Sequence, residues 1–387
     1  MLLSYSYRLY PNATQRDDLE RILAIHRGLY NDALTERRLA WEKQRKSISY
    51  VDQANQLKAI RQFDEDAAWV NFSSVQQTLR RLDKAFQAFY RRIKAGEKPG
   101  YPRYKGHRRF NSVCYVCNDG LRLSGSRLYI QRVGTVRMFQ HRPLPEAAKI
   151  KMVIIKRDSC DNWYAIFQVE LPDVEPLTTP LDAIGIDMGL LSFIALSNGE
   201  EVDNPRWFRE GEERLARLQR IRSRCKRGSN RYAELTRLIR RHHKRIANRR
   251  KDFHHKLSRA LVNQFPLLFV EDLNIKRLSR SHVAKSMADA GWSQFLFFLD
   301  YKAANAGGQR IKVDARDTSQ YCPKCGCSVE KSLAIRVHRC QSCGYVAPRD
   351  VAAAQVILKR GLARTEPGRK EFQADVSLAW SPEAPLF

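Results

Sequence analysis

The chain has 387 residues, 43% of them hydrophobic, and its 69 Lys+Arg against 41 Asp+Glu give a formal net charge of +28. This composition excludes disorder throughout, because the chain can bury real cores, and the length allows two or three domains. The surplus charge predicts a polyanionic partner, and nucleic acid is favoured over membrane because no stretch approaches 18 apolar residues. The first ten residues lack the pattern of a signal peptide, so we expect a cytoplasmic, nucleoid-associated protein.

Two helices are predicted in the first hundred residues. Apolar residues at three-and-four spacing predict one helix between Asp18 and Arg38, and an apolar stripe from Val75 to Ile93 predicts another. We expect these helices to form a unit over residues 11–95. Its basic face fits an ordinary solvated surface or contact with nucleic acid, and the unit's own sequence leaves both interpretations open.

The segment after this unit interleaves aromatic and basic residues, among them Arg103, Tyr104 and Lys105. Rings that stack on bases beside cations that contact phosphates suit single-stranded nucleic acid, although ordinary loops share this composition. Alternating segments separated by turn residues then predict an antiparallel β barrel. The predicted strands are Ser112–Val116, Leu121–Ile130, Val133–Phe139, Lys149–Lys156 and Trp163–Leu171. Residues 172–180 are predicted to be a linker.

A second sheet begins after the linker. Ala183–Asp187 is a short apolar run that ends in a carboxylate, and Phe193–Leu196 is a second strand closed by a turn at Asn198 and Gly199. Residues 206–259 then hold 20 Lys+Arg and 5 Asp+Glu and predict a helical hairpin hinged near Gly228. A solvated helix surface would mix charge signs, whereas like charges at helical spacing favour a surface that follows phosphates.

The remaining elements alternate between strand and helix. We predict a strand at Leu267–Val270, a helix over 288–306, a strand over 310–314 and an Ala-rich helix after Asp350. The tail, residues 363–387, has three prolines and no clean period, so it is predicted to be disordered.

Four of the nine cysteines form two C-x-x-C pairs, Cys322 with Cys325 and Cys340 with Cys343. Each pair is followed by glycine, which lets the backbone turn so that its amides can hydrogen-bond the thiolates. Four thiolates around tetrahedral zinc leave no open position, so the predicted site is structural rather than hydrolytic. Three other cysteines are interpreted as bystanders: Cys114, Cys117 and Cys327.

Three carboxylates stand at the ends of predicted elements. Asp187 and Glu271 end apolar strands, and Asp350 stands at the N-terminus of a helix. Any one of them is ordinary, since Asp and Glu are common at helix caps and strand ends. Three such carboxylates lie within one α/β segment of a protein whose positive charge suits a polyphosphate partner. They suggest a site for two Mg²⁺ or Mn²⁺ ions that hydrolyses a phosphodiester.

Several motifs, taken in order and spacing, resemble the transposon-encoded TnpB family. They are Ile184–Gly189 (IGIDMG), Val270–Asn274 (VEDLN), Thr318–Gly326 (TSQYCPKCG), Arg349-Asp350 before the Ala-rich helix, Asp289–Trp292, Tyr7–Pro11 and Pro102–Lys105. The resemblance covers nearly the whole chain up to about residue 360. It implies an RNA-guided DNA endonuclease of an insertion sequence, related to the compact type V CRISPR effectors.

The resemblance also implies a fold: a multi-domain α/β protein with a β barrel and a helical unit, in which an RNase H-like (RuvC-like) nuclease domain carries an inserted zinc ribbon. The expected parts are a wedge barrel (1–10 and 96–178), a recognition unit (11–95), the nuclease domain (179–317 and 346–362) and the ribbon (318–345). The implied partners are a guide RNA from the transposon end and double-stranded target DNA, bound by a protein monomer.

Roles for single residues follow from the resemblance. Asp187, Glu271 and Asp350 become the metal-binding catalytic acids, and Cys322, Cys325, Cys340 and Cys343 become the zinc ligands. Gln76 or Arg80 becomes a contact to the short motif that flanks the target.

The chain departs from the family at two positions. The family's third acidic motif carries Asn two residues after the Asp and again four further on, where this chain has Ala352 and Val356. This departure leaves open an RNA-guided DNA-binding regulator with weak or no cleavage. A transposase that itself joins DNA also stays open, since such enzymes use three carboxylates too.

Overall fold

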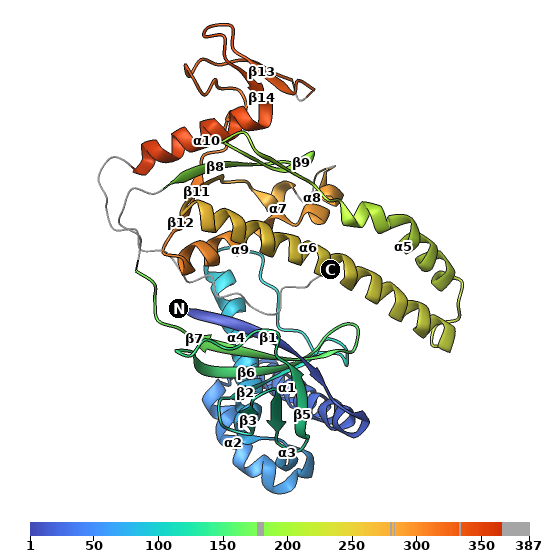
Figure 1. Cartoon of the computed structure of the whole chain (residues 1–387). Helices are drawn as coiled ribbons and strands as arrows, with labels where there is room; N and C mark the ends of the chain where they lie inside the picture. Colours follow the sequence, from blue (N-terminus) through green and yellow to red (C-terminus); the bar gives the residue numbers. More distant parts are fainter. Residues whose placement is uncertain (176–181, 279–280, 282, 333, 366–387) are drawn as a thin grey trace. The chain divides into compact units, whose positions relative to one another are not determined.

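The structure is a computed structural model that describes residues 1–175, 182–278, 281, 283–332 and 334–365 (Figure 1). It divides into two compact units, Met1–Asp173 and Val174–Phe387. The boundary lies in the predicted linker, of which residues 176–180 fall outside the described residues. The predicted disordered tail also falls outside them, except that Ala363–Thr365 continue the last helix, so the tail was predicted to begin too early.

The first unit is built on an antiparallel sheet of seven strands. They are β1 (Leu2–Tyr10), β2 (Ser112–Val116), β3 (Leu121–Ser124), β4 (Arg127–Ile130), β5 (Gly134–Phe139), β6 (Lys149–Arg157) and β7 (Trp163–Glu170). Their order is β2-β6-β7-β1-β5-β4-β3, so the first strand of the chain pairs between two later ones. In the described residues the ladder is open, with β2 and β3 at its ends, rather than the closed barrel that was predicted.

The single strand predicted over 121–130 is wrong. It is a hairpin of β3 and β4, with Ser124 paired to Arg127 across a turn at Gly125. Gly125 has φ +54°, a left-handed conformation that glycine adopts without steric cost.

Four helices complete the first unit: α1 (Ala13–Gln44), α2 (Tyr50–Phe63), α3 (Glu65–Trp69) and α4 (Phe72–Lys94). Asn12 caps α1 in a reciprocal capping box with Gln15. The predicted stripe of α4 is buried from Val75 to Phe86, where it joins a core with α1 and the sheet. The stripe ends there, since Ile93 is 49% exposed.

The second unit is built on a mixed sheet of five strands: β8 (Ala183–Met188), β9 (Ser192–Leu196), β10 (Glu201–Asp203), β11 (Leu267–Glu271) and β12 (Gln309–Val313). Their order is β10-β9-β8-β11-β12, which puts the first strand in the centre. β8, β11 and β12 are parallel, whereas β9 is antiparallel to β8 and β10. The carboxyl ends of three neighbouring strands therefore meet at one edge, where open α/β sheets bind their ligands.

The described part of this unit contains six helices: α5 (Trp207–Ser223), α6 (Asn230–Gln264), α7 (Ile275–Leu278), α8 (Ala284–Ala290), α9 (Trp292–Asn305) and α10 (Arg349–Thr365). α5 and α6 form the predicted helical hairpin, with Gly228 at φ +88° between them (Figure 1). The predicted helix over 288–306 is two helices, because Gly291 has φ +66°. A Cβ there would also lie 2.8 Å from the Arg250 side chain.

A small third sheet lies between β12 and α10 in the sequence. Its strands, β13 (Val337–Arg339) and β14 (Val346–Pro348), pair antiparallel beside the four cysteines of the predicted ribbon. None of the helices in the described ranges has the length and the apolar run needed to cross a bilayer.

Candidate functional site

The side-chain alternation of β8 and β11 brings two of the predicted acids to one face of the sheet. Ile186 and Val270 are register partners and pack in the core that includes α6 and α9. Phe269 points to the opposite face, where it packs with Ile357 of α10. Because successive side chains of a strand alternate, Asp187 and Glu271 also lie on the α10 face, on neighbouring strands.

Helix α10 approaches this face closely, which brings the third acid to the other two. Gly185 of β8 lies against it: a Cβ there would be 2.0 Å from the carbonyl oxygen of Ala354 and 2.8 Å from the amide of Leu358. Only a glycine leaves room for such contact between backbones. Asp350 lies in the first turn of α10, so the helix carries its carboxylate to the edge where β8 and β11 end.

The three acids also interact electrostatically. The pKa of the half-buried Asp187 is raised well above its usual value by burial first, then by the negative charges of Glu271 and Asp350. The Arg349 guanidinium and the Met188 amide oppose this rise. Repulsion between acids of this kind is relieved when a cation binds among them, and oxygen ligands suit Mg²⁺ or Mn²⁺.

Glu271 is held by a residue that has no predicted role. Glu271 itself is 8% exposed, and burial raises the pKa of its carboxyl group. The buried Thr318 hydroxyl donates a hydrogen bond to Oε1 of Glu271, which lowers this pKa, as does the charge of Arg360. Thr318 begins the segment that leads to the first cysteine pair, so this contact ties the entry of the ribbon to an acid of the site.

Arg349 makes a second tie between the acids and the cysteine-bearing segment. Its buried guanidinium donates to Oγ of Ser319 at 3.3 Å and to the carbonyl of Ser332 at 3.2 Å. Its charge also lowers the pKa of Asp187. The sequence signal for Thr318, Arg349 and Gly185 was their place inside the motifs quoted above, but only the fold shows what each one contacts.

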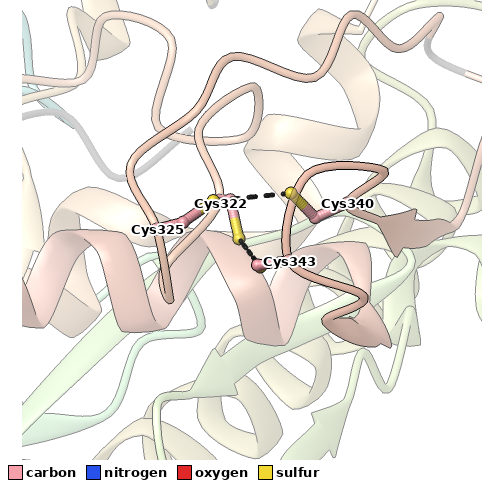
Figure 2. Close-up of side chains that lie close together, drawn as sticks. All are labelled: Cys322, Cys325, Cys340 and Cys343. Atoms are coloured by element: carbon pink, nitrogen blue, oxygen red, sulfur yellow. Dashed lines mark hydrogen bonds between the residues drawn. The ribbon is translucent and has the colours of Figure 1, made fainter.

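The four predicted zinc ligands lie together (Figure 2). One ligand atom from each of Cys322, Cys325, Cys340 and Cys343 lies within 4.8 Å of the others. Two sulfur pairs are 3.6 Å and 3.5 Å apart, close to the roughly 3.8 Å that tetrahedral geometry gives with Zn–S bonds of about 2.3 Å. The thiols therefore fit a tetrahedral zinc ion. In the described part of the chain, no group of acidic side chains is drawn together as tightly.

The two cysteine pairs are built alike. In each, the glycine amide donates to the carbonyl of the first cysteine, Gly326 to Cys322 at 3.0 Å and Gly344 to Cys340 at 2.9 Å. Both glycines are left-handed, with φ of +75° and +71°. The predicted bystander Cys327 has a backbone role here, because its carbonyl accepts a hydrogen bond from the Cys322 amide at 2.9 Å.

The residues predicted to contact nucleic acid lie in the first unit. Arg80 is exposed on α4, where its Nε donates to the Tyr50 hydroxyl at 3.1 Å and its guanidinium lies over that ring. Gln76 lies one turn before it and is half-buried. The predicted bystanders Cys114 and Cys117 are half-buried in the same unit.

The aromatic and basic segment after α4 is anchored to α1. The Lys105 amide donates to Oδ1 of Asn31 at 2.8 Å, and the Thr35 hydroxyl donates to the Tyr104 hydroxyl at 3.2 Å. Arg103, directly before these two anchored residues, is exposed. The loop is therefore an ordered one with a cation on its surface.

Ala352 and Val356, at which the chain departs from the family pattern, are 1% and 5% exposed on α10. An Asn at either position would bury a carboxamide among apolar side chains. The departure is thus accommodated by packing, and the acid at 350 keeps its place at the helix start.

Three family models match the chain. Residues 166–282 match OrfB_IS605, "Probable transposase", and residues 292–357 match the Cas12f1-like TNB domain. Residues 1–46 match the helix-turn-helix domain of the same transposase family, although these residues form β1 and the single helix α1.

Proteins with curated names match over nearly the whole length. A "Putative RNA-guided DNA endonuclease" of Streptomyces pristinaespiralis is 33% identical over 371 residues, covering 94% of this chain and 90% of the relative. InsQ of Escherichia coli, with the same description, is 29% identical and is covered to 93%. Mimivirus relatives at 26% identity over 55% of this chain are named TnpB-like proteins.

Among solved structures, the Cas12f1 chain of a complex with guide RNA and target DNA superimposes with a TM-score of 0.55 at 13% identity. The match covers 92% of this chain and 98% of that one, so the likeness is one of fold. One relative matches over nearly the full length at 33% identity, and the transposase family model matches the segment from β7 to β11. Because of these two matches, the chain belongs to the transposon-encoded TnpB family.

Proposed function

We propose that this protein is an RNA-guided DNA endonuclease of an insertion sequence. The observation that carries the proposal is the full-length similarity to relatives named as such endonucleases. The gathering of Asp187, Glu271 and Asp350 at one edge of the second unit's sheet supports cleavage by this chain itself. A cytoplasmic protein that acts at the nucleoid as a monomer with its RNA fits this reading.

The nuclease part is proposed to be a RuvC-like domain of RNase H-like fold. A mixed five-stranded sheet with acids on its central strand, on the neighbouring strand and on a helix packed against both supports this assignment. Asp187, Glu271 and Asp350 would hold two Mg²⁺ or Mn²⁺ ions. Such ions supply an activated water and stabilise the oxygen that leaves the cut phosphodiester.

The surrounding residues prepare this site. Thr318 orients Glu271 and keeps its pKa from rising further, so that the carboxylate is available as a ligand. Arg349 offsets part of the repulsion at Asp187. The raised pKa of Asp187 means that cation binding has to displace a proton more often there than at an exposed carboxylate.

The basic hairpin, α5 with α6, is the proposed surface for phosphates. Residues 206–259 carry a net charge of +15, and Leu215 is the buried residue of α5, so most of its side chains remain available to a partner. Guide RNA pairing would read the target sequence, while the protein reads backbone shape and a short flanking motif. We assign that motif to Gln76 or Arg80, and phosphate or base contacts to Arg103, Tyr104 and Lys105.

The four cysteines are proposed to hold one structural zinc ion. The ion would fix the ribbon (residues 318–345), which begins at Thr318 and is followed, just past β14, by Arg349. The wedge (1–10 and 96–178) and recognition unit (11–95) would grip the guide RNA and its hybrid with DNA.

A second candidate is an RNA-guided DNA-binding regulator. Ala352 and Val356 favour it, because these two buried side chains lack the carboxamide that the family pattern has at both positions. The presence of all three acids argues for cleavage. A transposase that joins DNA would use acids in a similar way, and the reaction products separate it from both.

The test is to co-express the protein with its flanking genomic sequence, identify the RNA that co-purifies and add target duplex with Mg²⁺. We expect cut DNA from the wild type and from Asp182→Ala, an exposed control just before β8, and bound but uncut DNA from Asp187→Ala. Bound, uncut DNA with the wild type would favour the regulator. Joined ends would favour the transposase, and no RNA-dependent binding would refute the proposal.

A further inference from the structure

Helix α5, the first half of the basic hairpin, is capped by a residue of another helix. The carboxylate of Asp289, in α8, accepts hydrogen bonds from the amides of Phe208 at 3.0 Å and Arg209 at 3.3 Å. Arg206, which holds the cap position of α5 itself, has φ +49° and donates instead to the Leu190 carbonyl at 3.5 Å. Because the first amides of a helix have no partner inside it, the start of α5 depends on Asp289.

The residues on either side of this cap hold the second helix of the hairpin. The carbonyl of Ala288 accepts a hydrogen bond from the Arg250 guanidinium, and the carbonyl of Ala290 accepts one from Nε2 of His254 at 3.0 Å. Burial lowers the pKa of His254 to about 4, so its ring is neutral and makes this contact without a charge. Residues 288–290, named the hairpin clamp below, thus hold α5 and α6 together.

The hairpin clamp is rooted in the core of the second unit. It overlaps the motif Asp289–Trp292, one of those that mark the resemblance to the TnpB family. Ala290 and Trp292 are 3% and 6% exposed and pack in the core that also holds Ile186 and Val270, the residues directly before two of the acids. The clamp therefore connects the hairpin to the strands that carry these acids.

Most of the hairpin's positive charge lies beyond the clamp. Of the 20 Lys+Arg in residues 206–259, 13 lie between residues 214 and 248, together with a single acid. Two of the acids nearer the clamp, Glu210 and Glu212, are in ion pairs. Figure 1 shows the hairpin extending away from the five-stranded sheet, so the charged part is far from the contacts that hold it.

A small change at the clamp therefore moves these charges a long way. A helix rises about 1.5 Å per residue, so the part of α6 from Asn230 to Arg250 is about 30 Å long. A tilt of about 10° at the clamp would move the far end by about 5 Å. This exceeds the roughly 3.4 Å along the helix axis between successive phosphates of one DNA strand. Such a tilt would take the basic side chains out of register with the phosphates they face.

We propose that Asp289 is a positioning residue, which sets the direction of the basic hairpin and thereby aligns its charges with the phosphates of the bound nucleic acid. This role rests on the proposed function, which assigns phosphate contacts to the hairpin. Asp289 acts through α5, as an acceptor for two amides, and its negative charge is not what the role requires.

The test compares three full-length variants, with the RNA that co-purifies with the wild type as the probe. Asp289→Ala removes the cap, and Asp289→Asn keeps an acceptor oxygen for the amides. Asp182→Ala, an exposed acid just before β8, is the control. Each variant removes one negative charge, so charge alone predicts the same change in all three. RNA affinity is measured over a range of salt, because the slope of log affinity against log salt counts phosphate contacts, at roughly 0.7–0.9 per contact.

We expect the salt slope of Asp289→Ala to fall by two or more contacts, about 1.4–1.8, and the slopes of Asp289→Asn and Asp182→Ala to match the wild type. Hydrogen exchange in peptides that cover Phe208 and Arg209 should become faster in Asp289→Ala alone. Unchanged exchange would refute the cap. Faster exchange with a wild-type slope would overturn the positioning role, and so would an equal fall in Asp289→Asn, which would assign the effect to charge.

A further variant keeps the test decisive if Asp289→Ala does not fold. Asp289→Glu keeps the charge and the acceptor but moves the acceptor by one methylene, so the same fall in slope is expected, and a wild-type slope would count against the proposal. The two proposals fail in different ways. If the wild type binds no RNA, the proposed function fails and the positioning role with it. If the wild type binds RNA and the slope does not depend on Asp289, only the positioning role fails.

Discussion

Replacement of Gly185 by alanine tests whether the close packing of α10 against β8 sets the geometry of the three acids. The added Cβ would lie 2.0 Å from the Ala354 carbonyl oxygen and 3.0 Å from Cβ of Leu358. The first of these is a backbone atom, so no side chain can move aside. Helix α10 has to withdraw from β8, and Asp350 withdraws with it.

The size of the effect follows from these distances. Separations below 3.0 Å are essentially never found for a Cβ, so the helix must shift by at least about 1 Å. An extra methyl group forced into a well-packed contact lowers the free energy of unfolding by about 1–3 kcal/mol. In a unit of this size, that lowers Tm by about 2–12 °C. A misplacement of about 1 Å in a reacting group costs on the order of 100-fold in rate.

The assay compares Gly185→Ala with Gly28→Ala, a glycine of α1 whose added Cβ meets nothing closer than 3.9 Å. Thermal unfolding and single-turnover cleavage by the RNA complex are measured for both. We expect lower Tm and about 100-fold slower cutting for Gly185→Ala alone, with target binding retained. Wild-type cleavage by Gly185→Ala would refute the argument that backbone contact between α10 and β8 positions the acid.

Three further predictions concern the acids and the cysteines. Asp187→Asn should raise Tm in the absence of Mg²⁺ at neutral pH. A buried acid whose pKa is raised in the folded state destabilises the fold as the pH rises past the pKa of the unfolded chain, about 3.9. A lower Tm of Asp187→Asn at pH 7 would contradict this. Thr318→Val removes a hydrogen bond that lowers the pKa of Glu271, so the acid limb of the pH–rate profile should move to higher pH. Thr318→Ser keeps the hydroxyl and should leave the limb in place. An unchanged acid limb in Thr318→Val would count against the contact. Cys343→Ser should reduce bound zinc below one ion per chain and lower Tm, whereas Cys327→Ser should keep its zinc. Metal analysis of both variants measures this. Equal zinc content in the two variants would argue against the proposed ligand set.

Much of the second unit could be predicted from the sequence because each signal was local. Apolar runs that end in a carboxylate predicted β8 and β11, and the cysteine spacing with glycine predicted two knuckles that the structure brings together. What could not be predicted is which face each acid takes relative to α10. That depends on the closeness of the helix to Gly185, a property of the packed fold.

Two of the wrong predictions, the single helix over 288–306 and the single strand over 121–130, have a common physical origin in single glycines. Apolar residues stand on both sides of Gly291 and of Gly125, so the sequence predicts one element in each case. The structure breaks both elements there, since each glycine takes a left-handed backbone. At Gly291 the Arg250 side chain also comes so close that a Cβ would not fit. Contacts from a distant helix are invisible to a local pattern.

The order of the acids along the chain has a consequence for synthesis on the ribosome. Asp187 and Glu271 are made before Asp350, whose helix follows both the basic hairpin and the cysteine pairs. Since chains fold progressively from the N-terminus as they emerge, the two strands can form a sheet well before the third acid reaches it. A nascent chain can therefore expose its cationic helices before the set of three acids is complete.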